Sequence, residues 1–90
     1  MNPLEIAGIK IVKPIKSGKT LEILQTYNNL YNEKMAAFKN CAEKLFGSSQ
    51  LTNDQIDEVW KNKEVAPYFD KCWGFRKENY RTLCRMGLIF

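Results

Sequence analysis

Apolar side chains recur at alternating spacings of three and four residues between Leu21 and Phe46. The positions of this seam are Leu21, Leu24, Asn28, Tyr31, Met35, Phe38, Ala42 and Leu45. The periodicity is typical of a helix that presents one stripe to a partner. At about 1.5 Å per residue the predicted helix, 21–46, spans about 39 Å. The rest of the chain, or another protein, must pack against it.

Asn28 is the single polar residue of the seam. It is expected either to specify the register of a neighbouring helix or to bond a nearby backbone carbonyl. Tyr27 and Cys41 widen the apolar face, which favours a bundle or a docking groove over a free coiled coil. The chain's own helices are therefore expected to cover most of the seam. Pairing of two copies through Leu21–Leu45 is the less favoured alternative.

Capping residues mark the predicted helix ends. Thr20 is a candidate N-cap for the long helix, and Gly47 is a candidate left-handed C-cap. Thr52 is followed three residues later by Gln55, the spacing of a capping box. This signal predicts a short second helix over 53–62.

A third helix is predicted over 67–86, because Pro67 suits a first helical turn and Gly87 suits a helix end. Its apolar stripe is interpreted as core and consists of Phe69, Cys72, Trp73, Arg76, Tyr80, Leu83 and Cys84. The fold class is therefore mainly α, a small three-helix domain over 20–90.

Residues 1–19 differ from the rest of the chain. They are apolar and β-branched, but two prolines and two glycines exclude a helix of any length. An extended basic arm with a short strand near 9–12 is the predicted conformation. An apolar terminus of this kind is ordered only where it docks, and we expect it to dock on a partner subunit.

The net charge of +4 is unevenly distributed along the 90 residues. Residues 1–19 carry +3, residues 20–70 carry −3 and residues 71–90 carry +4. Two basic ends around an acidic middle are typical of proteins that meet an acidic protein, nucleic acid or a membrane surface, and equally of internal complementarity. No apolar run approaches the roughly 20 residues of a membrane span.

Candidate chemistry is sparse. The chain has no histidine, the commonest acid–base group, and its three cysteines form no Cys-x-x-Cys pair. Ser17-Gly18-Lys19-Thr20 fails as a phosphate loop because Lys13 stands where the first glycine is required. We expect no enzyme, no cofactor and no metal site. The cysteines are interpreted as buried thiols of an intracellular, reducing compartment.

The segment from Cys72 to Cys84 resembles one helix of the small mitochondrial coiled-coil-helix proteins with twin Cys-x9-Cys motifs. Several of those are respiratory-chain subunits or assembly factors, so the resemblance implies a mitochondrial complex as one setting. It covers about fifteen residues, and the spacing here is Cys-x11-Cys. Cys41 alone stands in place of a second pair, so twin disulfides cannot form.

Two functions remain as hypotheses. The favoured one is a non-catalytic accessory subunit or adaptor that packs on a larger assembly through its apolar, basic termini. The alternative is a small nucleic-acid-binding protein that places its lysines and arginines on phosphates, although it has no recognisable reader motif. The predicted partner-binding residues are Ile9, Lys10, Ile11, Lys13, Lys16, Lys19, Arg76, Arg81, Arg85, Leu88, Ile89 and Phe90.

Overall fold

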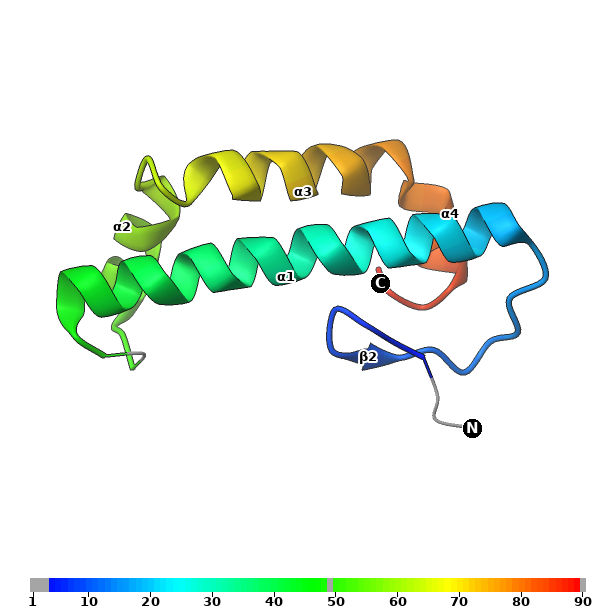
Figure 1. Cartoon of the computed structure of the whole chain (residues 1–90), viewed down its shortest axis with the longest axis horizontal. Coiled ribbons are helices and arrows are strands. Elements are labelled where there is room, and N and C mark those ends of the chain that lie inside the picture. Colours follow the sequence, from blue (N-terminus) through cyan, green and yellow to red (C-terminus); the bar gives the residue numbers. More distant parts are fainter. Residues whose placement is uncertain (1–3, 49, 90) are drawn as a thin grey trace.

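Two antiparallel helices, α1 and α3, form the long body of the molecule (Figure 1). The structure, a computed structural model, describes residues 4–48 and 50–89. The elements in chain order are β1 (Glu5–Ile6), β2 (Ile9–Lys10), α1 (Gly18–Phe46), α2 (Asn53–Lys61), α3 (Ala66–Glu78) and α4 (Tyr80–Arg85). The molecule measures 44 × 28 × 19 Å and is mainly helical, which confirms the predicted fold class.

Helix α1 begins earlier than its sequence signal predicts. Ser17 is the N-cap, and its hydroxyl oxygen accepts a hydrogen bond from the Lys19 backbone N–H at 3.2 Å. The assignment of Thr20 as the cap is therefore wrong, because Ser17 offers the same interaction nearly one turn before it. At the other end Gly47 has a φ of 66°, the left-handed C-cap that the sequence predicts.

Helix α2 follows its sequence signal closely. The Thr52 backbone N–H donates to Gln55 Oε1 at 2.9 Å, and the Gln55 backbone N–H donates to Thr52 Oγ1 at 3.3 Å. These reciprocal bonds are the predicted capping box. The helix ends at Lys61, one residue before the predicted end.

The predicted third helix is two helices, α3 and α4, separated at Asn79. Asn79 has φ −114° and ψ 25°, outside helical geometry. Its side-chain amide donates to the Phe75 carbonyl at 3.1 Å, the same acceptor that its backbone N–H uses. Asparagine competes for local backbone groups in this way, which weakens a helix at that point. Helix α4 then turns out of the line of α3 (Figure 1) and buries Leu83 completely.

The chain reverses after α4 at Gly87, whose φ is 83°. The Leu88 N–H donates to the Leu83 carbonyl at 2.9 Å and the Gly87 N–H to the Cys84 carbonyl at 3.1 Å, a Schellman arrangement. Leu88 and Ile89 consequently return to the core. Both were predicted to bind a partner, and here they are buried within the chain.

The N-terminal arm is a β-hairpin. Ala7 and Gly8 have φ values of 53° and 81°, which form the tight turn between β1 and β2. Ile6 pairs with Ile9, and the Ile11 N–H donates to the Leu4 carbonyl at 2.8 Å. Ile6 and Ile11 of this segment pack with residues of α1 and α4, so it docks on the chain's own helices and not, as expected, on a partner subunit.

Asn28 explains how the hairpin is held. Its Oδ1 accepts a hydrogen bond from the Ala7 backbone N–H at 3.0 Å. Neither predicted role is correct, because the asparagine bonds a backbone N–H of the distant hairpin turn rather than a carbonyl or a partner helix. The polar residue of the seam thus anchors the N-terminal segment.

Replacing Asn28 by alanine is expected to lower the free energy of unfolding by about 1 to 3 kcal/mol, since a half-buried N–H loses its acceptor. Asn28→Asp keeps an acceptor oxygen and should retain most of the stability. Urea unfolding followed by circular dichroism measures both. Equal losses in the two variants would contradict the assigned role.

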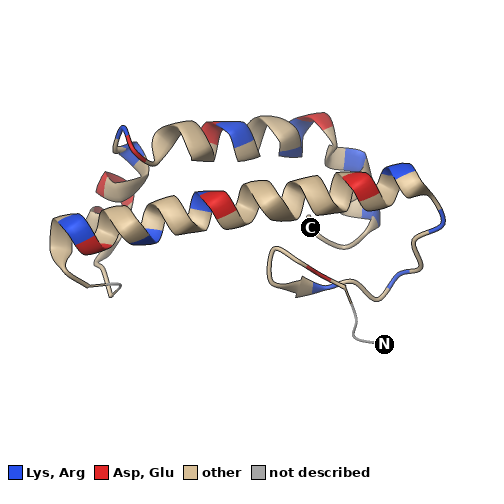
Figure 2. Ribbon diagram, in the orientation of Figure 1, with Lys and Arg blue, Asp and Glu red and all other residues tan. Residues whose placement is uncertain are grey.

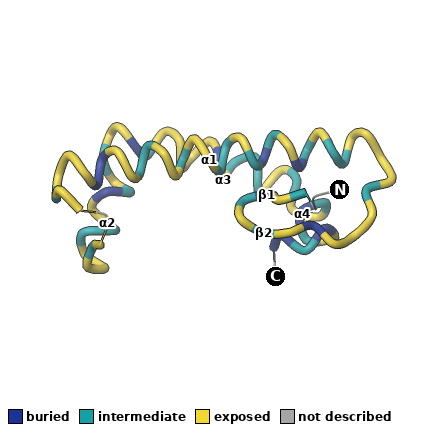
Figure 3. Tube along the Cα trace, turned by 60° about the horizontal axis from the view of Figure 1, so that its bottom comes forward, coloured by how far each residue is buried: buried dark blue, intermediate teal, exposed yellow. Residues whose placement is uncertain are grey.

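Two separate cores lie toward opposite ends of α1 (Figure 3). The hairpin-end core consists of Ile6, Ile11, Leu24, Tyr27, Leu83, Met86, Leu88 and Ile89. The α2-end core consists of Cys41, Ala42, Val59 and Val65. Between and beyond them the seam is incompletely covered, and Met35 and Leu45 are 38% and 48% exposed.

In the described residues no helix combines the length and apolarity needed to cross a bilayer.

Candidate functional site

Four aromatic side chains form a row that joins α1, α2 and α3. The ring centroids are 4.4 Å apart for Phe38 and Trp60, 5.4 Å for Trp60 and Phe69, and 6.4 Å for Phe69 and Trp73. We call these four residues the aromatic row. Phe69 and Trp73 are 38% and 47% exposed, so the row begins beside the α2-end core and ends in solvent. The prediction that Phe69 and Trp73 belong to the core is therefore wrong.

Two cations lie over these rings. Lys34 Nζ is 4.7 Å from the ring centroid of Tyr31, 5.7 Å from that of Trp60 and 5.9 Å from that of Phe69. The Arg76 guanidinium is 5.1 Å from the centroid of Trp73. Both pairs within a helix, Tyr31–Lys34 and Trp73–Arg76, have the i, i+3 spacing that brings side chains together. Each contact is a cation–π interaction.

Within residues 4–48 and 50–89, no carboxylate forms an ion pair with either cation. Among the described residues the one ion pair joins Lys44 and Glu64, whose side chains are largely exposed, at 3.6 Å. Lys34 and Arg76 both lie at half-buried positions beside apolar rings. Arg76 lies on the apolar stripe predicted for the third helix, where a guanidinium needs an acid or an aromatic face, and Trp73 supplies the aromatic face.

A hollow of about 270 Å³ lies between the two cations. It is lined by Tyr27, Lys34, Phe69, Cys72, Trp73, Arg76 and Leu88. Tyr27, Cys72 and Leu88 are buried, whereas Phe69 and Trp73 are exposed. Its volume is below the range typical of cofactor pockets. We call it the aromatic–cationic hollow, and its size suits one inserted side chain.

Burial raises the pKa of the Tyr27 phenol above its ordinary value of 10.0, Cys72 adds to this rise and Arg76 opposes it. The folded chain thus favours the neutral phenol. Burial of the neutral Tyr27 phenol therefore contributes fully to the free energy of unfolding below pH 10, and this contribution is lost as the pH rises through the raised pKa. In a spectrophotometric titration of the four tyrosines, Tyr27→Phe should remove a component that ionises above pH 10.0. Removal of a component that ionises at or below that pH would contradict the assignment.

The predicted basic residues gather at one end of the molecule. The arm and α4 lie in the half of the molecule that contains the start of α1 (Figure 2). Their basic residues are Lys10, Lys13, Lys16, Lys19, Arg81 and Arg85. All are exposed. Residues 4–27 and 76–89 together carry eight basic and three acidic side chains, and residues 28–75 carry six and seven. The charge separation along the sequence thus becomes a separation in space.

The other predicted site residues are placed differently. Ile11, Leu88 and Ile89 lie in the hairpin-end core, and Ile9 is half-buried against it. Arg76 lines the aromatic–cationic hollow. Phe90 lies outside the described residues. The structure therefore brings the predicted cations together but removes most of the predicted apolar contacts from the surface.

Of the residues in the aromatic row and the aromatic–cationic hollow, only Arg76 and Leu88 are predicted site residues. Sequence reasoning misses the others, among them Lys34 and Trp60. Lys34 sits three residues after Tyr31 and four before Phe38, a spacing that places a cation among rings on one helix face. Trp60 belongs to the apolar face of a short helix, and its contacts with the other two helices depend on tertiary packing. The sequence spacing alone could have indicated that Lys34 lies among rings, whereas no local pattern indicates the contacts of Trp60.

Cys41 and Cys72 are buried and Cys84 is half-buried, and all three are free. Within the described segments no three potential metal ligands cluster. Comparison with family models, curated proteins and solved structures finds no match.

Proposed function

We propose that the chain is a non-catalytic adaptor or accessory subunit that binds a partner protein through the aromatic row and the aromatic–cationic hollow. One observation carries the proposal. Phe69 and Trp73 stay more than a third exposed although both belong to a continuous set of packed rings. Burying such rings would add to the stability of a small chain, and here they are left at the surface.

The composition of this face supports the proposal. Tryptophan, tyrosine and arginine dominate the energetics of protein interfaces, and they act best where neighbouring contacts exclude water. The rings are also held in place by their own stacking, so little side-chain entropy would be lost on binding. The apolar termini no longer support an adaptor function, because Leu88 and Ile89 are buried.

The chemistry of the partner follows from the two cations. Lys34 and Arg76 flank the hollow and contact no carboxylate among the described residues. A complementary segment would offer an aspartate or glutamate to a cation and an apolar side chain to the exposed rings. We therefore propose an acidic, amphipathic protein segment as the occupant.

The test compares tagged wild-type chain with Lys34→Glu and a matched control, Lys39→Glu, an exposed lysine of the same helix. Each is purified from the native source at equal expression, and circular dichroism checks the fold. We expect wild type and Lys39→Glu to retain the same partner and Lys34→Glu to retain at least tenfold less. Cross-linked peptides should map the contact to an acidic segment.

Three results would contradict the proposal. The partner could remain bound to Lys34→Glu, it could be lost equally from both variants, or the bound protein could be a second copy of this chain. The last result would instead assign the face to a homo-oligomer.

Nucleic-acid binding is the second candidate function, favoured by the eight basic side chains gathered at one end of the molecule. In this case affinity for a short duplex should fall steeply with salt, because bound cations release counterions. Electrophoretic mobility shifts at increasing salt concentrations measure this. Absence of binding at low salt would exclude it.

A further inference from the structure

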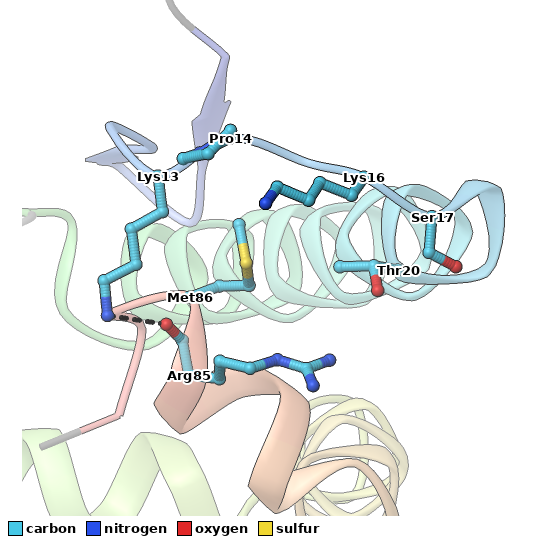
Figure 4. A pocket seen from close by; sticks show the side chains of 7 residues that line it. All are labelled: Lys13, Pro14, Lys16, Ser17, Thr20, Arg85 and Met86. Atoms are coloured by element: carbon cyan, nitrogen blue, oxygen red, sulfur yellow. Dashed lines mark hydrogen bonds between the residues drawn. The ribbon is translucent and has the colours of Figure 1, made fainter.

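A second cavity, of about 390 Å³, lies where the arm, the start of α1 and the end of α4 meet (Figure 4). It is lined by Lys13, Pro14, Lys16, Ser17, Thr20, Arg85 and Met86. We call it the basic cavity. It shares no residue with the aromatic–cationic hollow, although both border the hairpin-end core.

The basic cavity is built by contacts between distant parts of the sequence. Lys13 Nζ donates a hydrogen bond to the Arg85 carbonyl oxygen at 2.7 Å, which joins the arm to the end of α4 (Figure 4). Met86 is 6% exposed, and its buried side chain belongs to the hairpin-end core. Met86 thus joins the cavity to the hairpin-end core, and the Lys13 hydrogen bond holds the arm against the end of α4.

The lining combines two kinds of surface. Three cations, Lys13, Lys16 and Arg85, surround the cavity, and no aspartate or glutamate is among the lining residues. Ser17 and Thr20 add hydroxyl groups. Pro14 and Met86 supply an apolar wall, and the Lys16 ammonium extends toward it in Figure 4.

Phosphate esters match these features. A phosphate monoester carries a charge of about −1.5 to −2 at neutral pH and three strong acceptor oxygens. Arginine and lysine are the usual donors to such oxygens, arginine as a planar fork and lysine as a point charge. The cavity is also larger than a phosphate group requires, and its apolar wall leaves a surface for the body of the molecule.

We propose that the basic cavity binds a small phosphorylated molecule, with its phosphate on Lys16 and Arg85 and its apolar body on Pro14 and Met86. Lys13 holds the arm against α4 and adds its charge to the site. This inference does not depend on the proposed adaptor function, because the two surfaces share no residue.

Phenyl phosphate is the probe, titrated into the full ¹⁵N-labelled chain and followed by two-dimensional NMR. We expect saturable shifts confined to the amides of residues 13–20 and 84–87. Arg85→Gln should weaken binding at least tenfold, because a charge-assisted contact is lost. The matched control is Arg81→Gln, which removes the same charge from an exposed position on α4 outside the cavity. It should change affinity less than twofold.

Three further probes identify the source of the phosphate. Inorganic phosphate should bind the same amides more weakly than phenyl phosphate, because it has no apolar body. A single-stranded oligonucleotide without terminal phosphates and vesicles of anionic phospholipid should bind no more tightly than phenyl phosphate. Equal losses in Arg85→Gln and Arg81→Gln, non-saturable shifts, or tighter binding of the oligonucleotide or vesicles would overturn the proposal.

Discussion

Replacing Leu83 by alanine is expected to lower the free energy of unfolding by about 3 to 4 kcal/mol, the largest effect of any single change considered for this chain. Leu83 is fully buried in the hairpin-end core, although it lies on a helix of only six residues. Its carbonyl also accepts the Leu88 N–H that returns the C-terminal segment to the core. A loss of this size is a large fraction of the stability of a 90-residue domain.

Urea unfolding followed by circular dichroism measures this change. Leu45→Ala is the matched control, because it removes the same atoms from a position that is 48% exposed, and it should cost well below 1 kcal/mol. Similar losses at both positions would show that α4 does not pack on the hairpin-end core as described.

Replacing Trp73 by alanine is expected to weaken partner binding by about 30-fold or more, as truncation of an interface hot spot does. Trp73 lines the aromatic–cationic hollow, stacks on Phe69 with an interplanar angle of 6°, and supports the Arg76 guanidinium. Its loss would remove an exposed ring and release the cation from its position. Since the side chain is 47% exposed, the cost to folding should be small by comparison.

Isothermal titration calorimetry with the identified partner measures the affinity of this variant. Tyr80→Ala is the control, because Tyr80 is 50% exposed but lies on α4 outside the row and the hollow. Its affinity should stay within about twofold of wild type. If Tyr80→Ala lowered the affinity as much as Trp73→Ala, the result would contradict the proposal that the partner binds at the aromatic face.

Much of the fold follows from local signals in the sequence. The seam of α1, the capping box at Thr52 and the glycines at 47 and 87 each depend on a few neighbouring residues, and the structure bears them out. The break at Asn79 had a local cause as well. A continuous apolar stripe on both sides of it favoured one long helix, and the competing side-chain bond to Phe75 prevailed.

The candidate site was less accessible from the sequence. The hairpin depends on a hydrogen bond between Ala7 and Asn28, which are 21 residues apart, so no local pattern shows where the arm docks. The aromatic stripe was expected to be core, but the two cores form at opposite ends of α1 and leave Phe69 and Trp73 uncovered. Exposure of a ring depends on which helices cover it, and the sequence does not specify this.

The basic residues show the opposite case. Two basic segments at the ends of the chain predicted an electrostatic surface, and folding brings both to the same end of the molecule (Figure 2). What the sequence could not show is that Lys13 bonds the Arg85 carbonyl and thereby forms a cavity. The sequence predicts how many basic residues each end of the chain carries. It does not predict that the two ends meet, because this depends on how the hairpin folds back on the helices.

Site-specific photo-cross-linking in the native source tests most directly whether the partner contacts the aromatic face or the chain termini. A photoreactive benzoylphenylalanine replaces Phe69 in one chain and Val12, which is 89% exposed on the arm, in another. The aromatic row predicts a cross-link to one partner protein from position 69 and none from position 12. A cross-link from position 12 with none from position 69 would contradict the proposed face and return the contact to the basic terminus.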